Sequence, residues 1–190
     1  HLDRLALGAL RLGIPLPSPA RLKADASLLL QGVDSGVLKV ILTRGRSTRG
    51  YRPPADPQPT RALILTESAS TAAEVGPAAC GARVRICQAR LGINPQLAGL
   101  KHLNRLEQVL ARAEWADGDV DEGLMLDAEG ALVCGTMSNL FLVDDCALKT
   151  PLIDRCGVAG TARARVLDTA RATGIEVREG RFTLADLVRA

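Results

Sequence analysis

The sequence predicts an α/β protein in two parts, a smaller N-terminal α/β domain over residues 1–78 and a larger domain over residues 79–190. Segments with the apolar spacing of helices alternate with short β-branched apolar segments, which is typical of mixed α/β folds. A stretch rich in Ala, Ser and Gly from Glu67 to Gly81 separates the two parts. A chain of 190 residues, 47% of them hydrophobic, is long enough to bury a sizeable core.

The N-terminal part begins with a predicted helix over residues 1–12, which Gly13 and the prolines after it end. A second helix is expected over residues 20–30. The apolar segments VLKVILT, residues 37–43, and RALILT, residues 61–66, predict two strands. Between these strands the polar segment RGRSTRGYRPP predicts an exposed loop.

The second part begins with a predicted strand over residues 82–89, with Val84 and Ile86 on one side. Asn94-Pro95 predicts a turn, after which leucines and one valine recur at helical spacing up to Leu110. The segments 122–127, 131–134, 140–143, 147–150 and 175–178 predict strands, with a break at Gly135. A helix is expected over residues 161–173, and Thr183 is expected to cap a final one.

The composition excludes several classes of protein. The net charge is only +3 and the arginines are scattered, which disfavours nucleic-acid binding. No apolar run approaches the roughly 20 residues that span a bilayer. The five cysteines are odd in number and contain no CxxC pair, so we expect no disulfide framework, no metal site and a cytoplasmic location. No GxSxG, P-loop or GxGxxG segment occurs. Both ends lie inside expected helices, so we expect further residues beyond them.

Lys101 is the first candidate for chemistry. It lies near the start of the leucine-rich pattern, so we expect its amine to be shielded from water. Desolvation disfavours the ammonium form and suits a lysine to act as a nucleophile or base. The alternative is an ordinary surface lysine at the start of an amphipathic helix. The neighbouring His102 points away on a helix, and a packed or hydrogen-bonded role is expected for it.

A second candidate is the glycine-rich turn before the predicted helix at residue 161. Gly157 and Gly160 precede that helix. The N–H groups of a helix N-terminus bind anions when nothing else accepts their hydrogen bonds. The alternative is ordinary helix capping.

The segment GLKHLNRLEQVLARAE resembles the cofactor-lysine segment of the 4-amino-4-deoxychorismate lyases. These belong to the fold-type IV pyridoxal-phosphate enzymes, together with branched-chain and D-amino-acid aminotransferases. The resemblance implies a small α/β domain followed by a larger pseudo-barrel domain. It also implies that Lys101 forms a Schiff base with pyridoxal 5'-phosphate and later moves a proton.

Further residues follow from the resemblance. HLDRL is similar to a family helix whose arginine holds the cofactor phosphate, which implies that role for Arg4. The turn Gly160-Thr161-Ala162 corresponds to the phosphate-binding turn, with backbone donors at Thr161 and Ala162. GTMSNLF is similar to a family segment beside the cofactor, which implies that Asn139 and the preceding Cys134 lie there. Relatives carry a glutamate at the position of Cys134, where it pairs with the pyridine nitrogen, and a thiol supplies no such charge.

The loop after the first strand resembles the loop that faces the substrate in the lyases. Its residues Arg44, Arg49 and Tyr51 are therefore candidates for binding the substrate carboxylates. The resemblance implies elimination of pyruvate from aminodeoxychorismate to give 4-aminobenzoate for folate synthesis, in a homodimer. The alternatives are an aminotransferase of the same fold and, because of Cys134, Ala162 and the expected missing ends, a homologue that binds without turnover.

Overall fold

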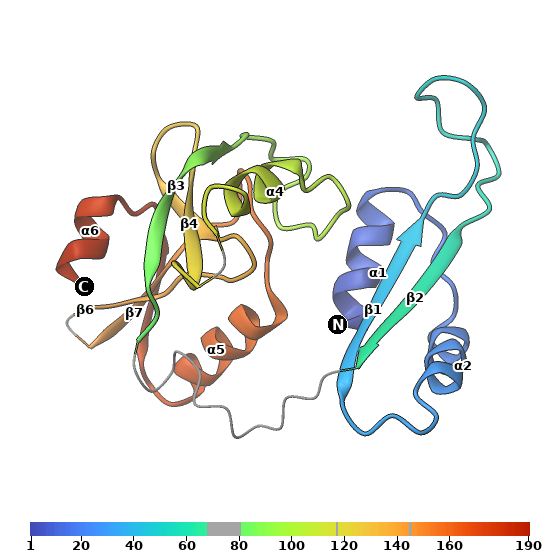
Figure 1. Ribbon diagram of the computed structural model, residues 1–190, viewed down its shortest axis with the longest axis horizontal. Helices are drawn as coiled ribbons and strands as arrows, with labels where there is room; N and C mark the ends of the chain where they lie inside the picture. The colour runs from blue at the N-terminus through green and yellow to red at the C-terminus, as the bar shows by residue number, and fades with distance from the viewer. Residues whose placement is uncertain (68–80, 117, 145) are drawn as a thin grey trace. The chain divides into compact units, whose positions relative to one another are not determined.

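The computed structural model describes residues 1–67, 81–116, 118–144 and 146–190 (Figure 1). The chain divides into two compact units, His1–Val75 and Gly76–Ala190, called unit 1 and unit 2 below. The predicted boundary near residue 78 lies outside the described residues. The α/β class is confirmed, because both units combine helices with sheets.

The described residues of unit 1 form two helices and one pair of strands. The elements are α1 (Leu2–Arg11), α2 (Pro19–Leu29), β1 (Gly36–Thr43) and β2 (Thr60–Glu67). The strands are antiparallel, with Gly36 opposite Glu67 and Thr43 opposite Thr60. All four elements were predicted within one or two residues. Ser18 caps α2 by accepting from the Arg21 N–H at 3.2 Å, which explains why that helix starts at Pro19.

Unit 2 contains two three-stranded sheets. The first has the order β3-β4-β5, from β3 (Val84–Leu91), β4 (Glu122–Asp127) and β5 (Leu132–Gly135). The second has the order β6-β7-β8, from β6 (Leu142–Asp144), β7 (Ala147–Pro151) and β8 (Glu176–Gly180). Each sheet has one parallel and one antiparallel pair.

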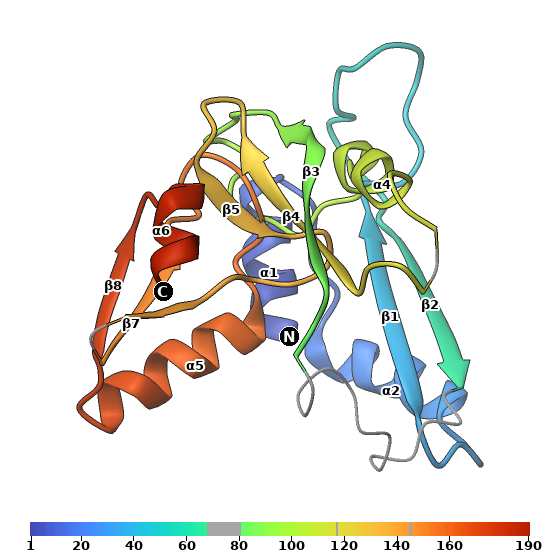
Figure 2. The ribbon, with the colours of Figure 1, turned by 60° about the vertical axis from the view of Figure 1, so that its left-hand side comes forward.

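Three helices accompany these sheets. α4 (Leu106–Arg112) lies in the connection from β3 to β4, and α5 (Thr161–Ala172) lies in the connection from β7 to β8. Figure 2 shows α5 alongside β7 and β8. α6 (Leu184–Arg189) follows β8 and begins with the expected cap, because the Thr183 side chain and Asp186 form a capping box.

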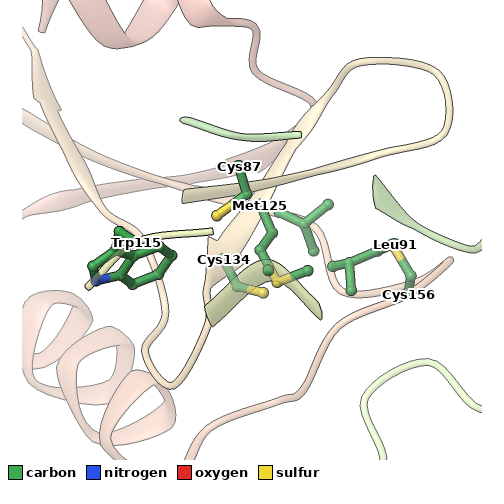
Figure 3. Packing of buried hydrophobic residues seen from close by; sticks show 8 residues of the cluster. Cys87, Leu91, Trp115, Met125, Cys134 and Cys156 are labelled. Carbon is green, nitrogen blue, oxygen red and sulfur yellow. The ribbon is translucent and has the colours of Figure 1, made fainter. Parts of the chain in front are cut away.

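The core of unit 2 lies around Met125 of β4. It is built from small and sulfur-containing side chains with one aromatic ring: Cys87, Leu91, Ala111, Trp115, Met125, Val133, Cys134 and Cys156 (Figure 3). Trp115 is anchored by its Nε1, which donates to the Val120 carbonyl at 3.1 Å. The predicted strand is confirmed, and its buried residues are Cys87 and Leu91, whereas Val84 is 51% exposed and Ile86 is partly exposed.

Candidate functional site

Lys101 lies in a loop between β3 and α4. The predicted turn at Asn94-Pro95 is confirmed, because the Asn94 carbonyl accepts from the N–H groups of Leu97 and Ala98, each at 3.0 Å. The predicted helix after this turn does not begin there. Gly99 has a positive φ of 80°, and the chain becomes helical only at Leu106, after Arg105 at the N-cap position. Lys101 therefore precedes the helix.

The expected shielding of Lys101 is also wrong, since this residue is exposed. So are four of the six apolar residues whose spacing predicted a buried helix face: Leu103 is 63%, Leu106 70%, Val109 60% and Leu110 64% exposed. The buried residue of α4 is Ala111, and Leu100 is buried in the loop before it. The periodicity located a helix correctly, but the residues that it buries differ from the prediction.

Backbone hydrogen bonds attach the lysine loop to the glycine turn that precedes α5. The Gly99 N–H donates to the Gly157 carbonyl at 3.1 Å, and the Ala159 N–H donates to the Gly99 carbonyl at 3.1 Å. Gly99 and Val158 thus form a parallel bridge. Lys101 lies two residues beyond this bridge, and the first residue of α5 lies three residues beyond it. The structure therefore brings together the two segments that the sequence identified separately.

The N-terminus of α5 follows the predicted glycine turn. Gly160 is the N-cap residue, and no side chain caps this end. The N–H groups of the first helical turn have no acceptor within the helix. Their dipoles add to a partial positive charge at this end. Arg163 of the same turn is engaged elsewhere, because its Nη2 donates to the Pro151 carbonyl at 3.0 Å and to Glu179 at 2.7 Å.

Asn139 holds the glycine turn from the other side. Its Nδ2 donates to the Val158 carbonyl at 2.9 Å, and its backbone forms a bridge with Cys134. A Cβ atom on Gly160 would lie 2.1 Å from the Asn139 Oδ1, so only glycine fits there without a shift of the asparagine. Asn139 and Cys134 are therefore in one structural unit with the Gly160 turn.

Cys134 is buried beside Met125 in the core and is 6% exposed (Figure 3). Burial raises the pKa of its thiol to about 12, and the nearby Cys156 acts in the same direction. The positive charge of Arg105 lowers it by less. The side chain at this position is therefore a neutral thiol at physiological pH.

Glu122 is a residue of this region whose role the sequence analysis missed. Its Oε1 accepts from the N–H groups of Gly123 at 2.9 Å and Thr136 at 3.0 Å, and from the Thr136 hydroxyl at 2.6 Å. Its Oε2 accepts from the Ser138 hydroxyl at 2.8 Å and the Met137 N–H at 3.3 Å. One carboxylate thus organises the whole turn between Cys134 and Asn139. The run of hydroxyl residues in GTMSN was the only hint of this acceptor.

Burial of Glu122 tends to raise its pKa, but its hydrogen bonds outweigh that effect. The donors include the side chains of Thr136 and Ser138 and the backbone of Gly123, and the pKa of the carboxyl group is lowered below its ordinary value. Glu122 is therefore ionised at neutral pH, as an acceptor of five donors must be.

His102 is half-buried beside Lys101. Burial, and then the charge of Arg105, lower the pKa of its imidazole, so the ring is neutral. The ring Nδ1 is buried and has no hydrogen-bond partner among the described residues. The expected packed histidine is confirmed by its partial burial, but the structure shows no hydrogen bond at this nitrogen.

The remaining predicted residues belong to unit 1. Arg44 is partly buried, and its guanidinium donates to the carbonyls of Leu12 and Gly13 at the end of α1, to the latter at 2.7 Å. Arg4 lies on α1 and is partly exposed, whereas Arg49 and Tyr51 are exposed in the loop between β1 and β2. The structure therefore shows that Arg44 binds the main chain after α1, a contact within unit 1 that the sequence did not predict.

Two shallow hollows of unit 2 lie elsewhere. One, of about 310 Å³, is lined by residues of α5 together with Leu148 and Ile175. The other, of about 180 Å³, lies beside Phe182 and α6.

In the part of the chain that the structure describes, no cluster of three or more His, Cys, Asp or Glu side chains could hold a metal ion. Over the same residues, no helix has the length and apolar character needed to cross a lipid bilayer.

Comparison with known proteins agrees with this arrangement. Residues 1–190 match the family model described as Amino-transferase class IV. An aminodeoxychorismate lyase from Vibrio harveyi is 33% identical over 190 residues, which are 100% of this chain and 69% of that protein. The crystal structure of 4-amino-4-deoxychorismate lyase from Pseudomonas aeruginosa superposes with a TM-score of 0.89 at 46% identity, covering 98% of this chain and 68% of that chain.

An aminotransferase structure is also similar. The branched-chain amino acid aminotransferase from T.th., solved with pyridoxamine 5'-phosphate, gives a TM-score of 0.79 at 25% identity. The match covers 96% of this chain and 61% of that one. The chain thus spans roughly two thirds of the length of these three proteins.

Proposed function

The chain belongs to the class IV aminotransferase family, and on that premise we propose that it is an aminodeoxychorismate lyase that uses pyridoxal 5'-phosphate. The reaction would convert 4-amino-4-deoxychorismate into 4-aminobenzoate and pyruvate. One structural observation carries the proposal: the loop of Lys101 is bonded through Gly99 to the turn that opens the N-terminus of α5. An amine and an anion site on one framework suit a cofactor that has both an aldehyde and a phosphate.

The residues present fit this cofactor. The first turn of α5 carries backbone N–H groups at Thr161 and Ala162, and the glycine at 160 lets the turn pack against Asn139. We propose that Gly160, Thr161 and Ala162 hold the phosphate and that Arg4 adds a guanidinium to it. Asn139 would keep the phosphate turn in place through its bond to the Val158 carbonyl.

Lys101 would carry the chemistry. When bound, pyridoxal phosphate condenses with amines and withdraws electrons from the carbon that bears the amine. Lys101 would first hold the cofactor aldehyde and then be released by the substrate amine. Its free amine would take the proton from the ring carbon that carries the substrate nitrogen, and loss of the enolpyruvyl group would follow. Covalent and acid-base catalysis thus fall on one side chain.

Cys134 is the departure from the family pattern that bears most directly on activity. A neutral thiol supplies no negative charge to a pyridine nitrogen, so we propose that this chain works with a weaker electron sink. Elimination that forms an aromatic ring has a strong driving force of its own and should tolerate this better than transamination. Cys134→Glu should then change the cofactor absorbance and the turnover, and an unchanged spectrum and rate would contradict the assignment of this position.

Substrate binding is assigned to the loop of unit 1. Arg44, Arg49 and Tyr51 would bind the two carboxylates of aminodeoxychorismate, because guanidinium groups donate to carboxylates in pairs. Arg49 and Tyr51 are exposed, so a ligand can approach their side chains from solvent. Arg44 would have to leave the carbonyls of Leu12 and Gly13 or bind with its remaining donors.

The proposal is tested by adding pyridoxal 5'-phosphate to the purified protein. The expected result is an absorbance band near the violet that borohydride removes, with the reduced adduct on the peptide that contains Lys101. Lys101→Ala should abolish band and adduct, whereas Lys149→Ala, whose ammonium binds Asp144, should retain both. A band that survives in Lys101→Ala would overturn the assignment of this lysine.

An aminotransferase is the second candidate, because the branched-chain aminotransferase solved with pyridoxamine 5'-phosphate shares the fold at 25% identity. The two activities differ in their requirement for an acceptor. The lyase releases pyruvate and 4-aminobenzoate from aminodeoxychorismate without any keto acid, and the transaminase needs one. Binding of the cofactor without either product would identify the third possibility, a homologue that no longer turns over.

Three further expectations stay predictions: a homodimer, a cytoplasmic location and a domain boundary near residue 78. Light scattering after gel filtration would measure the oligomeric state, and fractionation would measure the location. Limited proteolysis that separates fragments on either side of residue 78 would support the boundary.

A further inference from the structure

Arg105 closes the loop that contains Lys101. Its Nε donates to the carbonyl of His102 at 3.0 Å, and its Nη2 donates to the carbonyl of Leu100 at 2.5 Å. These two carbonyls belong to the residues immediately before and after Lys101. A single guanidinium thus holds the main chain on both sides of the lysine.

The other end of the loop is held by the backbone. Gly99 is bonded in both directions to the segment of Gly157 and Ala159, and Leu100 is buried with its N–H on the Leu97 carbonyl at 3.1 Å. Lys101 therefore lies between a backbone bridge on one side and the Arg105 contacts on the other. An exposed loop residue would otherwise sample many backbone conformations.

An arginine suits this task because its donors form a rigid planar fork, whereas an ammonium is a compact charge on a flexible stem. Arg105 is partly buried, and burial lowers the pKa of its guanidinium, an effect that the electrostatic contributions of Cys134 and Glu107 oppose. Arginine nevertheless stays protonated in proteins. The contacts to the two carbonyls therefore persist at any pH at which the protein is folded.

We infer that Arg105 is a positioning residue for Lys101, which fixes the peptide on both sides of the lysine so that its amine meets a carbonyl compound in one orientation. This rests on the proposed function of Lys101. A misplacement of a reacting group by about 1 Å can lower the reaction rate on the order of a hundredfold. Loss of the Arg105 hydrogen bonds should therefore slow the reaction of Lys101 without unfolding the protein.

The test compares Arg105→Gln and Arg105→Lys with Arg90→Gln. Arg90 is a matched control, because its guanidinium also donates to the carbonyl of a residue three positions earlier, Cys87. That contact lies within β3, before the loop that contains Lys101. Each variant is titrated with pyridoxal 5'-phosphate, reduced with borohydride and mapped by mass spectrometry over all four lysines. Folding is checked by the fluorescence of Trp115 under the same conditions.

Both Arg105 variants are expected to require roughly tenfold or more cofactor for half-maximal labelling of Lys101, and labelling of the other lysines should not change. Arg105→Lys keeps the charge but not the fork, so it should remain impaired. Arg90→Gln should label Lys101 as the unchanged protein does. Folded Arg105 variants that label Lys101 at the original concentration would overturn the inference.

A second measurement needs no cofactor. Endoproteinase Lys-C cleaves after lysine only where the loop can open, so Arg105→Gln should be cleaved after Lys101 at least about tenfold faster than Arg90→Gln. Equal rates would overturn the inference. If the unchanged protein takes up no pyridoxal phosphate at Lys101, the proposed function fails, and this comparison alone decides whether Arg105 holds the loop.

Discussion

Replacing Glu122 by glutamine is predicted to destabilise unit 2 by about 2 kcal/mol. The carboxylate accepts five hydrogen bonds, and three of them, from the Gly123 N–H and from the N–H and hydroxyl of Thr136, are partly buried. Hydrogen bonds to a charged group contribute roughly 0.5–1 kcal/mol more than neutral ones, and this gain is lost for each of the three. The new amide group would also face the Met137 N–H, which is exposed and can turn to water.

The assay is urea unfolding followed by tryptophan fluorescence. The chain has one tryptophan, and Trp115 is buried in the core of unit 2, so the signal reports on that unit. The expected result is a lower midpoint with an unchanged slope, since the exposed surface on unfolding is the same. Glu176→Gln is the control, because that carboxylate is 59% exposed and, among the described residues, bonds to Arg178 on its own strand, so the midpoint should stay unchanged.

The pH dependence of the unfolding free energy is a second test of the role of Glu122. The pKa of Glu122 is lowered in the folded protein, below its ordinary value of 4.5. Its stabilisation is therefore present above that value and is lost as the pH falls through the folded pKa. The difference in stability between the unchanged protein and Glu122→Gln should shrink in that acidic range. A variant within 0.5 kcal/mol of the unchanged protein at pH 7, on the order of experimental error, would refute the role of this carboxylate.

Two further predictions concern the turn before α5 and the buried thiols. Gly160→Ala places a Cβ atom 2.1 Å from the Asn139 Oδ1, so it should lower the free energy of unfolding in urea by about 1–3 kcal/mol and weaken pyridoxal phosphate binding. Gly8→Ala is the control, because Gly8 has open space around it and its replacement should not destabilise the protein. Equal unfolding midpoints for the two variants would contradict the close contact. Iodoacetamide at pH 8 should modify the exposed Cys146 well before Cys134 or Cys156. The reason is that burial raises the pKa of the Cys134 thiol to about 12 and that of the Cys156 thiol to about 11. Peptide mapping that finds Cys134 labelled as fast as Cys146 would refute this.

Local patterns predicted most elements because their signals lie within a few residues. Gly13 and Thr183 end and begin helices where they were predicted to, and the apolar segments at 37–43 and 61–66 became the paired strands β1 and β2. The helix after Pro95 was predicted too early. The positive φ of Gly99 and the Arg105 contacts to Leu100 and His102 keep the loop non-helical, and apolar spacing carries no information about them.

The candidate site was recognised from the sequence only in pieces. The motif around Lys101 and the glycines before residue 161 were identified, but their attachment through Gly99 and Val158 was not. Asn139 was named from a resemblance, and the structure supplies its contact with the Val158 carbonyl. Glu122 was read only as the first residue of a strand, because nothing in its neighbours shows that the turn after Cys134 folds back onto it.

The sequence by itself determined most of the helical and extended segments, the positions of Lys101 and the glycine turn, and the family to which the chain belongs. The tertiary structure decided that Lys101 is exposed, that its loop joins the α5 turn, and that Glu122 and Arg105 hold the two loops of the site. The reason is physical. Periodicity and capping act between residues a few positions apart, whereas the burial of a side chain and the partner of a carboxylate depend on segments that meet only when the whole unit has packed.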